Sequence, residues 1–372
     1  MSHLVEKMAY VGQEPWHGLG NKLPAGQSIE TWASSAGMDW SIEQTPVRFV
    51  TGQADGMVNI GSFADQQVLY RSDNHEPLSV VSKRYKVVQP REILEFYRDL
   101  TEYAGFELET AGVLKGGRKL WALARTGQQA LLKGDDEVRG YLLLATACDG
   151  TLATTAQFTS VRVVCNNTLS IAVNRDADPG AGVIRVPHST EFDADAVKAQ
   201  LGLTITSWDR FISQMNRLAS RKVSAVEAEG FFLKVLNCSP KDVDFIDSET
   251  GEEGAEWLVT PEQLLTAGAL AQSPNIGTFM PSGAADLANA QSPALRNERA
   301  YKRVQELYTG AAMGANMTSA KSTAWGLVNA VTEFVDHHRK ARNQDNRLDS
   351  AWFGVGANLK KKALDEALLM LS

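Results

Sequence analysis

Basic side chains interleaved with aromatic rings recur through the first half of this 372-residue chain. Lysine and arginine neutralise phosphates, and an aromatic ring can stack on a nucleobase without reading its identity. This pattern predicts a surface for single-stranded nucleic acid, formed by Arg84, Tyr85, Lys86, Lys115, Arg118, Lys119, Phe158, Arg162 and Arg185. The expected phosphate contacts are Lys115, Arg118, Lys119 and Arg162. The alternative is a set of ordinary solvated cations on a sheet, with Trp121 in its core.

Other chemistries find weaker support in the sequence. Adjacent residues on a helix point about 100° apart, so His337 and His338 cannot both chelate one metal ion. Cys165 could form a nucleophilic triad with His188 and an Asp, but we expect its thiol on a buried apolar face, where it stays protonated and inert. The turn Lys115-Gly116-Gly117-Arg118 is not a phosphate-binding loop, because no helix follows it. We therefore predict no catalytic residue, no metal and no cofactor.

The elements that must position the cations include a hairpin at residues 140–165. Two apolar runs meet there at Asp149-Gly150, a pair that suits a tight type I′ turn. In the second run Phe158 and Arg162 alternate with Val161, and successive strand residues point to opposite faces. We expect the valine face to enter the core and the face with Phe158 and Arg162 to meet solvent.

The first half of the chain has the pattern of strands and turns. Short β-rich runs occur at 46–50, 68–71, 78–88, 107–114, 118–125 and 183–186. A helix is expected at 90–103, where Pro90 opens a run with apolar residues at helical spacing, and a short helix after Asn166. Tight Gly-rich joints cannot carry parallel crossovers, so the strands predict an antiparallel meander with inserted helices.

After Pro187 the periodicity becomes helical. Helices are expected at 192–222, at 225–236 behind a Ser224–Glu227 capping box, after Thr260, at 293–313 and at 321–342. The fold class is therefore α+β: an N-terminal antiparallel β-meander with inserted helices, followed by a mostly helical C-terminal half. We divide the chain into a sheet domain at 1–188 and a helical region at 189–372, which packs on or beside the sheet.

Charge is distributed unevenly along the chain. The net charge is −7, but residues 189–262 hold 7 Lys/Arg against 14 Asp/Glu, and residues 296–362 hold 12 against 6. A local excess of cations can attract a polyanion even to an acidic protein. Arg339, Lys340 and Arg342 are therefore a candidate second patch or subunit contact. The overall acidity favours instead a surface that meets another protein.

The chain has the composition of a protein outside membranes. No apolar run approaches the ~20 residues that cross a bilayer, and the N-terminus lacks a secretory pattern. The three cysteines, Cys148, Cys165 and Cys238, show no CxxC spacing and lie in apolar runs. An odd number of buried thiols is typical of a reduced compartment. The sequence therefore predicts a cytoplasmic location and no membrane partner.

Several longer motifs resemble a known family over nearly the whole chain. They are WHGLG at 16–20, AGMDW at 36–40, RYKVVQP at 84–90, AGVLKGGRKLW at 111–121, RVVCNNTL at 162–169 and STAWGLVNAVTEFVDH at 322–337. Together they resemble the phage/plasmid-like family of uncharacterised proteins, carried by phages, prophages and plasmids. The resemblance implies a mobile-element setting and brings no enzyme activity, cofactor or catalytic residue with it.

A meander followed by long helices is also similar in outline to the single-strand annealing proteins of phage recombination, a likeness of fold alone. It implies an ATP-independent protein that binds single-stranded DNA as a homo-oligomer and anneals complementary strands. One alternative is a mobile-element protein that binds a host defence or regulatory protein. Another is an unrecognised hydrolase or nuclease.

Overall fold

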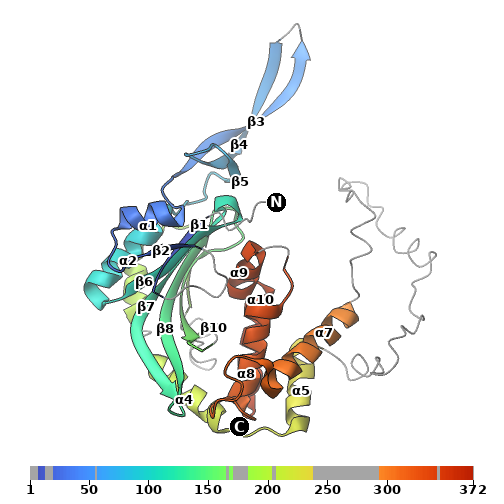
Figure 1. Cartoon of the computed structure of the whole chain (residues 1–372). Helices are drawn as coiled ribbons and strands as arrows, with labels where there is room; N and C mark the ends of the chain where they lie inside the picture. The colour runs from blue at the N-terminus through green and yellow to red at the C-terminus, as the bar shows by residue number, and fades with distance from the viewer. Residues whose placement is uncertain are drawn as a thin grey trace, which may run out of the picture.

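The fold combines a large sheet, a small sheet and a set of helices. The computed structural model describes residues 7–12, 20–54, 57–164, 167–170, 183–202, 207–237, 293–341 and 344–371. The strands precede most of the helices along the chain (Figure 1), which confirms the α+β class and the helical C-terminal half.

The large sheet contains the predicted meander. Its strands lie in the order β10-β9-β8-β7-β6-β1-β2, and β11 pairs with β9. From β6 to β10 every pairing is antiparallel, whereas β2 pairs parallel with β1. The bounds are β1 Lys7–Val11, β2 Asn21–Leu23, β6 Glu107–Leu114, β7 Lys119–Leu132, β8 Asp136–Ala147, β9 Thr154–Arg162, β10 Asn167–Ser170 and β11 Val183–Val186. The helix expected after Asn166 is wrong, because β10 occupies that place.

Helices α1 (Ile29–Ala36) and α2 (Pro90–Ala104) cover one face of the large sheet (Figure 1). The predicted helix at Pro90 is confirmed. It begins with a capping box between Gln89 and Glu92 and ends at Gly105, whose φ of 68° suits glycine. From this helix the Tyr97 hydroxyl reaches the Ala122 and Leu142 carbonyl oxygens, both at 2.9 Å. A single buried side chain therefore fixes the helix over β7 and β8.

The small sheet extends into a projecting ribbon. It consists of β3 (Ile42–Ala54), β4 (Met57–Arg71) and β5 (Pro77–Ser82) in that order. Strand β5 pairs only with the base of β4, from Gln66 onward. Beyond it, residues 48–54 and 57–64 form a two-stranded β-arm that points away from the body (Figure 1). The short strands expected at 46–50 and 68–71 lie inside these longer ones.

The helical half begins with α3 (Ala194–Gly202) and α4 (Ser207–Ser220), where the sequence predicted a single helix at 192–222. The capping box of α5 is confirmed: Ser224 Oγ accepts from the Glu227 amide at 3.3 Å, and Glu227 accepts from the Ser224 amide at 2.8 Å. The helix expected after Thr260 lies outside the described residues. The remaining elements are α5 (Ala225–Leu236), α7 (Pro293–Glu306), the π-helical turn η3 (Leu307–Ala311), α8 (Ala324–Glu333), the π-helical turn η4 (Phe334–His338), α9 (Gln344–Phe353) and α10 (Val355–Leu369).

Helices cover parts of both faces of the large sheet. The larger core contains apolar residues of α1 and α2 and extends to those of α4, α5, α8 and α10. On the opposite side, Trp121 and Leu143 pack with Leu348 and Trp352 of α9. The first core contains residues from both halves of the chain, and the division at residue 188 stays a prediction. Among the described residues, no helix combines the length and apolar character that a bilayer crossing requires.

The joint between the two sheets depends on a glycine, and this generates a first prediction. Gly117 has a φ of 99°, and a Cβ there would lie 2.9 Å from the Trp40 ring and 3.2 Å from Leu78. Its neighbour Gly116 has a φ of 70° but no atom within 4 Å of such a Cβ. Gly117→Ala combines left-handed strain with overpacking and should lower the free energy of unfolding by about 3 kcal/mol. Gly116→Ala carries only the strain, about 1 kcal/mol.

Urea denaturation of the two variants beside the parent chain measures this difference. Equal losses would contradict the packing argument, because strain alone would then account for both.

Candidate nucleic-acid interface

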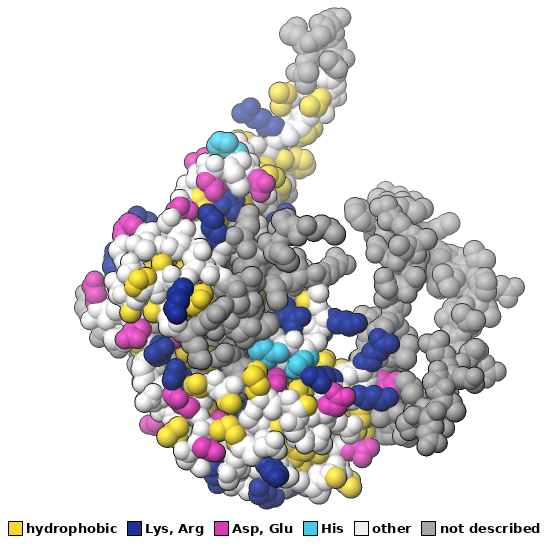
Figure 2. All heavy atoms as spheres, viewed as in Figure 1, with side chains coloured by type: hydrophobic (Ala, Val, Ile, Leu, Met, Phe, Trp, Pro, Cys, Tyr) yellow, Lys and Arg dark blue, Asp and Glu magenta, His cyan; other side chains and the backbone are white. Residues whose placement is uncertain are grey.

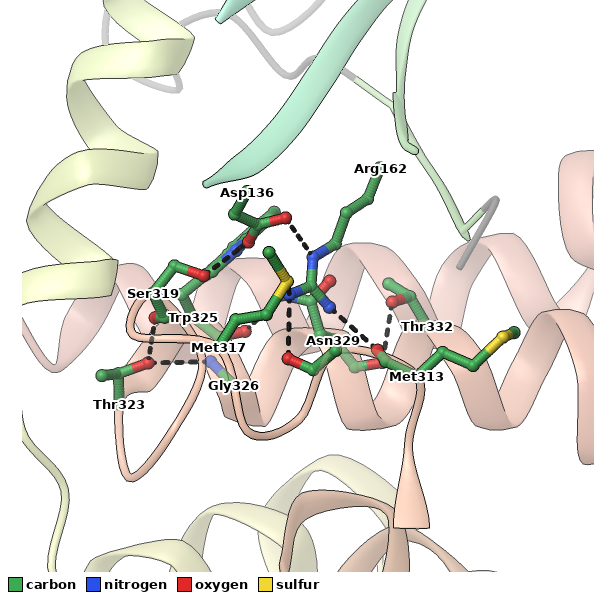
Figure 3. Close-up of polar contacts among 11 residues, drawn as sticks. Asp136, Arg162, Met313, Met317, Ser319, Thr323, Trp325, Gly326, Asn329 and Thr332 are labelled. Carbon is green, nitrogen blue, oxygen red and sulfur yellow. Dashed lines mark hydrogen bonds and ion pairs between the residues drawn. The ribbon is translucent and has the colours of Figure 1, made fainter. Parts of the chain in front are cut away.

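Arg162 is buried, contrary to the expectation that it faces solvent. Its guanidinium Nε lies 2.7 Å from Asp136 Oδ1, and the two residues are 2% and 0% exposed. The remaining nitrogens donate to the carbonyl oxygens of Met313 and Gly314 at 3.3 and 3.2 Å (Figure 3). Every described partner of Arg162 is thus a protein group, and a phosphate has no access to it in this structure. The prediction of a phosphate contact here is wrong.

Asp136 is the centre of this buried network. Besides Arg162, it accepts from Ser319 Oγ at 2.6 Å and from Trp325 Nε1 at 3.0 Å (Figure 3). Asp136 begins β8 and Arg162 ends β9, while Ser319 and Trp325 belong to the loop before α8 and to α8 itself. A buried carboxylate needs such donors, because desolvation without them costs several kcal/mol. The network therefore attaches the helical half to the lower end of β8 and β9.

Phe158 shares a face with Arg162 and is also buried, at 4% exposure. Residues of β9 alternate between two faces as predicted. The face with Phe158 and Arg162 is the buried one, however, and the valine face is the more exposed. Val161 and Val163 are partly exposed, whereas Phe158 packs in the core beneath the helices. Cys165, expected on the valine face, lies outside the described residues. The pattern predicted two faces correctly and could not tell which one the rest of the chain covers.

Lys115 and Lys119 are paired with one carboxylate. Both ammonium groups bind Asp349 of α9, Lys115 at 2.5 Å, and Lys119 is 5% exposed. Burial acts to raise the pKa of Asp349, but the hydrogen bonds from the two lysines outweigh it and hold that pKa below its ordinary value. These two predicted phosphate contacts are therefore engaged inside the molecule by a carboxylate that balances one of their two charges.

Four other predicted cations lie at the surface: Arg84, Lys86, Arg118 and Arg185. Lys83 beside them is exposed as well. Within the described ranges, Lys83, Arg84, Arg118 and Arg185 make no ion pair, and Lys86 pairs with Glu191 at 2.9 Å where both side chains are well exposed. Such an exposed pair contributes little and exchanges readily for another anion. We call the five residues Lys83, Arg84, Lys86, Arg118 and Arg185 the turn-end cluster.

Hydrogen bonds gather the segments of the turn-end cluster at one end of the sheet. The Cys148 amide donates to the Arg118 carbonyl at 2.9 Å, which joins the β6–β7 and β8–β9 turns. The Tyr85 hydroxyl donates to the Ala147 carbonyl at 2.6 Å. The His188 ring, three residues after Arg185, lies 2.9 Å from the Lys86 carbonyl oxygen and 3.0 Å from that of Leu152. Segments separated by as many as 102 residues therefore meet at this end.

Tyr85 is only partly available to a nucleobase. One face of its ring stacks on His188, with centroids 4.4 Å apart and planes 15° from parallel. Burial raises the pKa of its hydroxyl above the ordinary range. With Phe158 in the core, neither predicted stacking ring presents two free faces.

The remaining chemical candidates offer no reactive group. Burial and the adjacent Asp149 raise the pKa of the Cys148 thiol to about 12, so it stays protonated at neutral pH. Cys238 lies outside the described residues. Within those residues, no three His, Cys, Asp or Glu side chains gather around a possible metal position.

The C-terminal cations form a separate region. Figure 2 shows Lys and Arg side chains near histidine side chains on the face that it draws, with Asp and Glu among them. Lys340 is exposed, and Arg339 is half-buried, which lowers the pKa of its guanidinium. Asp336, three residues before Arg339, binds Lys360 of α10 at 2.8 Å. Arg342 lies outside the described residues.

Sequence reasoning missed the acidic partners. Asp136, Asp336 and Asp349 each bind a cation or donor more than twenty residues away. No local spacing signals such a pair. An isolated Asp at the start of a strand, as at Asp136, has the same appearance as a turn residue.

The comparisons with known proteins give one result. A family model described as a domain of unknown function (DUF932) matches residues 77–252 and 276–352, about two thirds of the chain. Neither the curated proteins nor the solved structures contain a significant match. The matched segments include the turn-end cluster and the Asp136–Arg162 network, and they begin after the β-arm.

The buried network generates a second prediction. Asp136→Asn removes the charge that Arg162 requires and should lower the free energy of unfolding by about 3–5 kcal/mol. Ser319→Ala removes one neutral donor and should lower the free energy of unfolding by about 1 kcal/mol. Glu191→Gln, at the exposed pair with Lys86, is the control and should leave urea denaturation unchanged. An Asp136→Asn variant as stable as this control would refute the docking role.

The Asp349 contacts generate a third prediction, concerning pH. A carboxylate with a lowered pKa stabilises the fold above the ordinary Asp value of 3.8 and loses that contribution as pH falls through its own pKa. Asp349→Asn should therefore lower the free energy of unfolding by about 2 kcal/mol at pH 7. The difference in this free energy between the variant and the parent chain should become smaller below about pH 4.

Urea midpoints at pH 7 and at acidic pH measure this effect. Asp195→Asn is the matched control, because that side chain is 94% exposed and should change neither midpoint. If the urea midpoints of the variant and the parent chain differ by the same amount at every pH, Asp349 acts through its shape and not through its charge.

Proposed function

The chain belongs to the DUF932 family of domains of unknown function, and from that premise we propose that it binds single-stranded nucleic acid through the turn-end cluster. The observation that carries the proposal is the gathering of Lys83, Arg84, Lys86, Arg118 and Arg185 at one end of the sheet. Four of the five make no ion pair within the described residues, so their charge is available to a partner.

The local balance of charge supports a polyanionic ligand. The acidic groups near the cluster include Glu191, which pairs with Lys86, and Asp149, which accepts from the amide and hydroxyl of Thr151. Asp65 is a third, because its carbonyl oxygen accepts from the Lys83 amide at 3.0 Å. Five cations against these three acids still leave a positive surface on a chain of net charge −7. The field near a surface follows such local clustering, so the overall acidity does not oppose binding here.

The available contacts determine the kind of binding. Guanidinium and ammonium groups neutralise phosphates, and counterion release then makes affinity fall steeply with salt. Stacking contributes less than the sequence suggested, because Phe158 is buried and one face of Tyr85 lies on His188. Binding should therefore be mainly electrostatic and independent of base sequence.

A role in annealing and recombination extends this proposal. The motif resemblance to phage and plasmid proteins and the outline shared with phage annealing proteins support a cytoplasmic mobile-element protein that pairs strands without ATP. A surface of five cations covers only a few nucleotides, so several copies would have to act side by side. Preference for single strands over duplex rests on that likeness of fold.

The fourth prediction tests the turn-end cluster directly. Arg84→Ala with Arg118→Ala removes two phosphate contacts and should weaken binding of a labelled single-stranded oligonucleotide about tenfold at low salt. The slope of log K against log salt should become shallower by about 1.4, because each contact contributes about 0.7 on single strands. Fluorescence anisotropy over a salt series measures both quantities.

The matched control is Arg210→Ala with Arg217→Ala. These exposed arginines lie on α4, near the β7–β8 turn at the opposite end of the sheet, where Lys133 contacts Ser220. Their loss changes net charge equally and should leave the slope as it is. If both double variants bind alike, or if the parent chain binds no oligonucleotide at low salt, the proposal fails. A divalent-metal screen with DNA, RNA and nucleotides tests the hydrolase alternative.

A further inference from the structure

The β-arm exposes a concentration of large apolar side chains. Phe49, Val50, Ile60 and Phe63 are 46%, 68%, 62% and 55% exposed. Figure 2 shows hydrophobic side chains at the surface along this projection. Elsewhere in the described chain, large exposed apolar residues include Val226 on α5 and Leu131 on β7, which lie on different elements. Scattered residues of that kind are ordinary, whereas a contiguous apolar surface indicates a partner.

Apolar groups occupy both faces of the β-arm. Phe49 covers Gly61 across the strands, and its ring lies 5.8 Å from that of Phe63. Val50 and Ile60 are directly paired, and they lie on the opposite face because neighbouring strand residues alternate. Neither face rests on the body of the protein, since both strands are exposed from Arg48 to Thr51 and from Asn59 to Ile60.

A two-stranded ribbon of this kind is poorly stable alone in water. Natural sheets protect free edges with charged side chains, but Arg48 is the single charged residue in the described part of the arm. The same lack of cations makes the arm unsuited to a phosphate polymer. Its composition therefore indicates contact with protein.

We propose that the β-arm is a self-association element, and that it packs against the arm of a second copy of this chain. Two-fold association brings the same surface of each copy together, and an arm with almost no charge meets its own copy without like-charge repulsion. The arms also project beyond bodies of net charge −7 (Figure 1), so two copies can join there while their bodies stay apart.

The available area agrees with this partner. A standard interface takes about 800 Å² from each side. Four large side chains exposed by about half supply on the order of 400 Å² of apolar area, and the polar side chains and backbone of the ribbon supply the rest. This inference does not rest on the nucleic-acid proposal, since none of the turn-end cations belongs to the arm.

The fifth prediction is a change of mass in solution. Sedimentation equilibrium of the full chain, without nucleic acid, should show a concentration-dependent dimer or larger species. Phe49→Ser with Phe63→Ser should weaken self-association at least tenfold. Val50→Ser with Ile60→Ser removes the apolar groups of the other face. The double variant with the larger loss of self-association identifies the face that is buried between the two copies. Val226→Ser with Leu131→Ser is the matched control and should leave the association constant unchanged.

A second measurement protects against a misfolded arm. In the parent chain, amide hydrogen exchange at residues 57–62 should slow as protein concentration rises, while exchange in α2 stays constant. A parent chain that remains monomeric up to about 100 μM, well above typical working affinities, overturns the proposal and leaves the arm to a different protein. Self-association that survives loss of all four apolar side chains overturns it equally.

Discussion

The requirement that buried charge be paired determines how the two halves of this protein meet. Asp136 has no exposure, and its carboxylate is satisfied by Arg162, Ser319 and Trp325 together. Removing two charges from water costs several kcal/mol per ion unless donors replace the lost hydration. The loop before α8 and α8 itself supply two of those donors, Ser319 and Trp325, and cannot move away without leaving the carboxylate short of partners. Asp349 with its two lysines, and Asp336 with Lys360, fix α9 and α10 in the same way.

The same ion pairs restrict where a ligand can bind. They engage Arg162, Lys119 and Lys115, three of the four cations with the most favourable sequence context for phosphate contact. Arg118 differs because it lies at the turn between β6 and β7, where its side chain is exposed to solvent. Buried pairs thus hold the helices over the sheet, while exposed cations remain at the turns.

Sequence reasoning succeeded where the signal is local. The Pro90 start of α2, the Ser224 capping box of α5 and the glycine turn between β6 and β7 each depend on a few adjacent residues, and each is confirmed. It failed where a feature depends on distant packing. The faces of β9 were exchanged because the loop before α8 covers the face with Arg162. That loop is distant in sequence: Ser319 lies 183 residues from Asp136. Of the predicted site, Arg84, Lys86, Arg118 and Arg185 remain exposed, while Arg162, Lys119 and Phe158 do not.

A count of cations is therefore a poor guide to polyanion binding unless the cations in internal ion pairs are left out of it. In this chain, leaving them out changes which surface is expected to be positive, although the net charge of the protein is −7 in either case. What remains separates into two surfaces of different chemistry: a cationic end of the large sheet and a nearly uncharged apolar arm on the small one. Under our two proposals, a phosphate polymer would be attracted to the first surface and would gain nothing at the second, whereas burial of apolar area would favour a protein at the second. The two proposed ligands would not compete, because neither uses the groups that would bind the other.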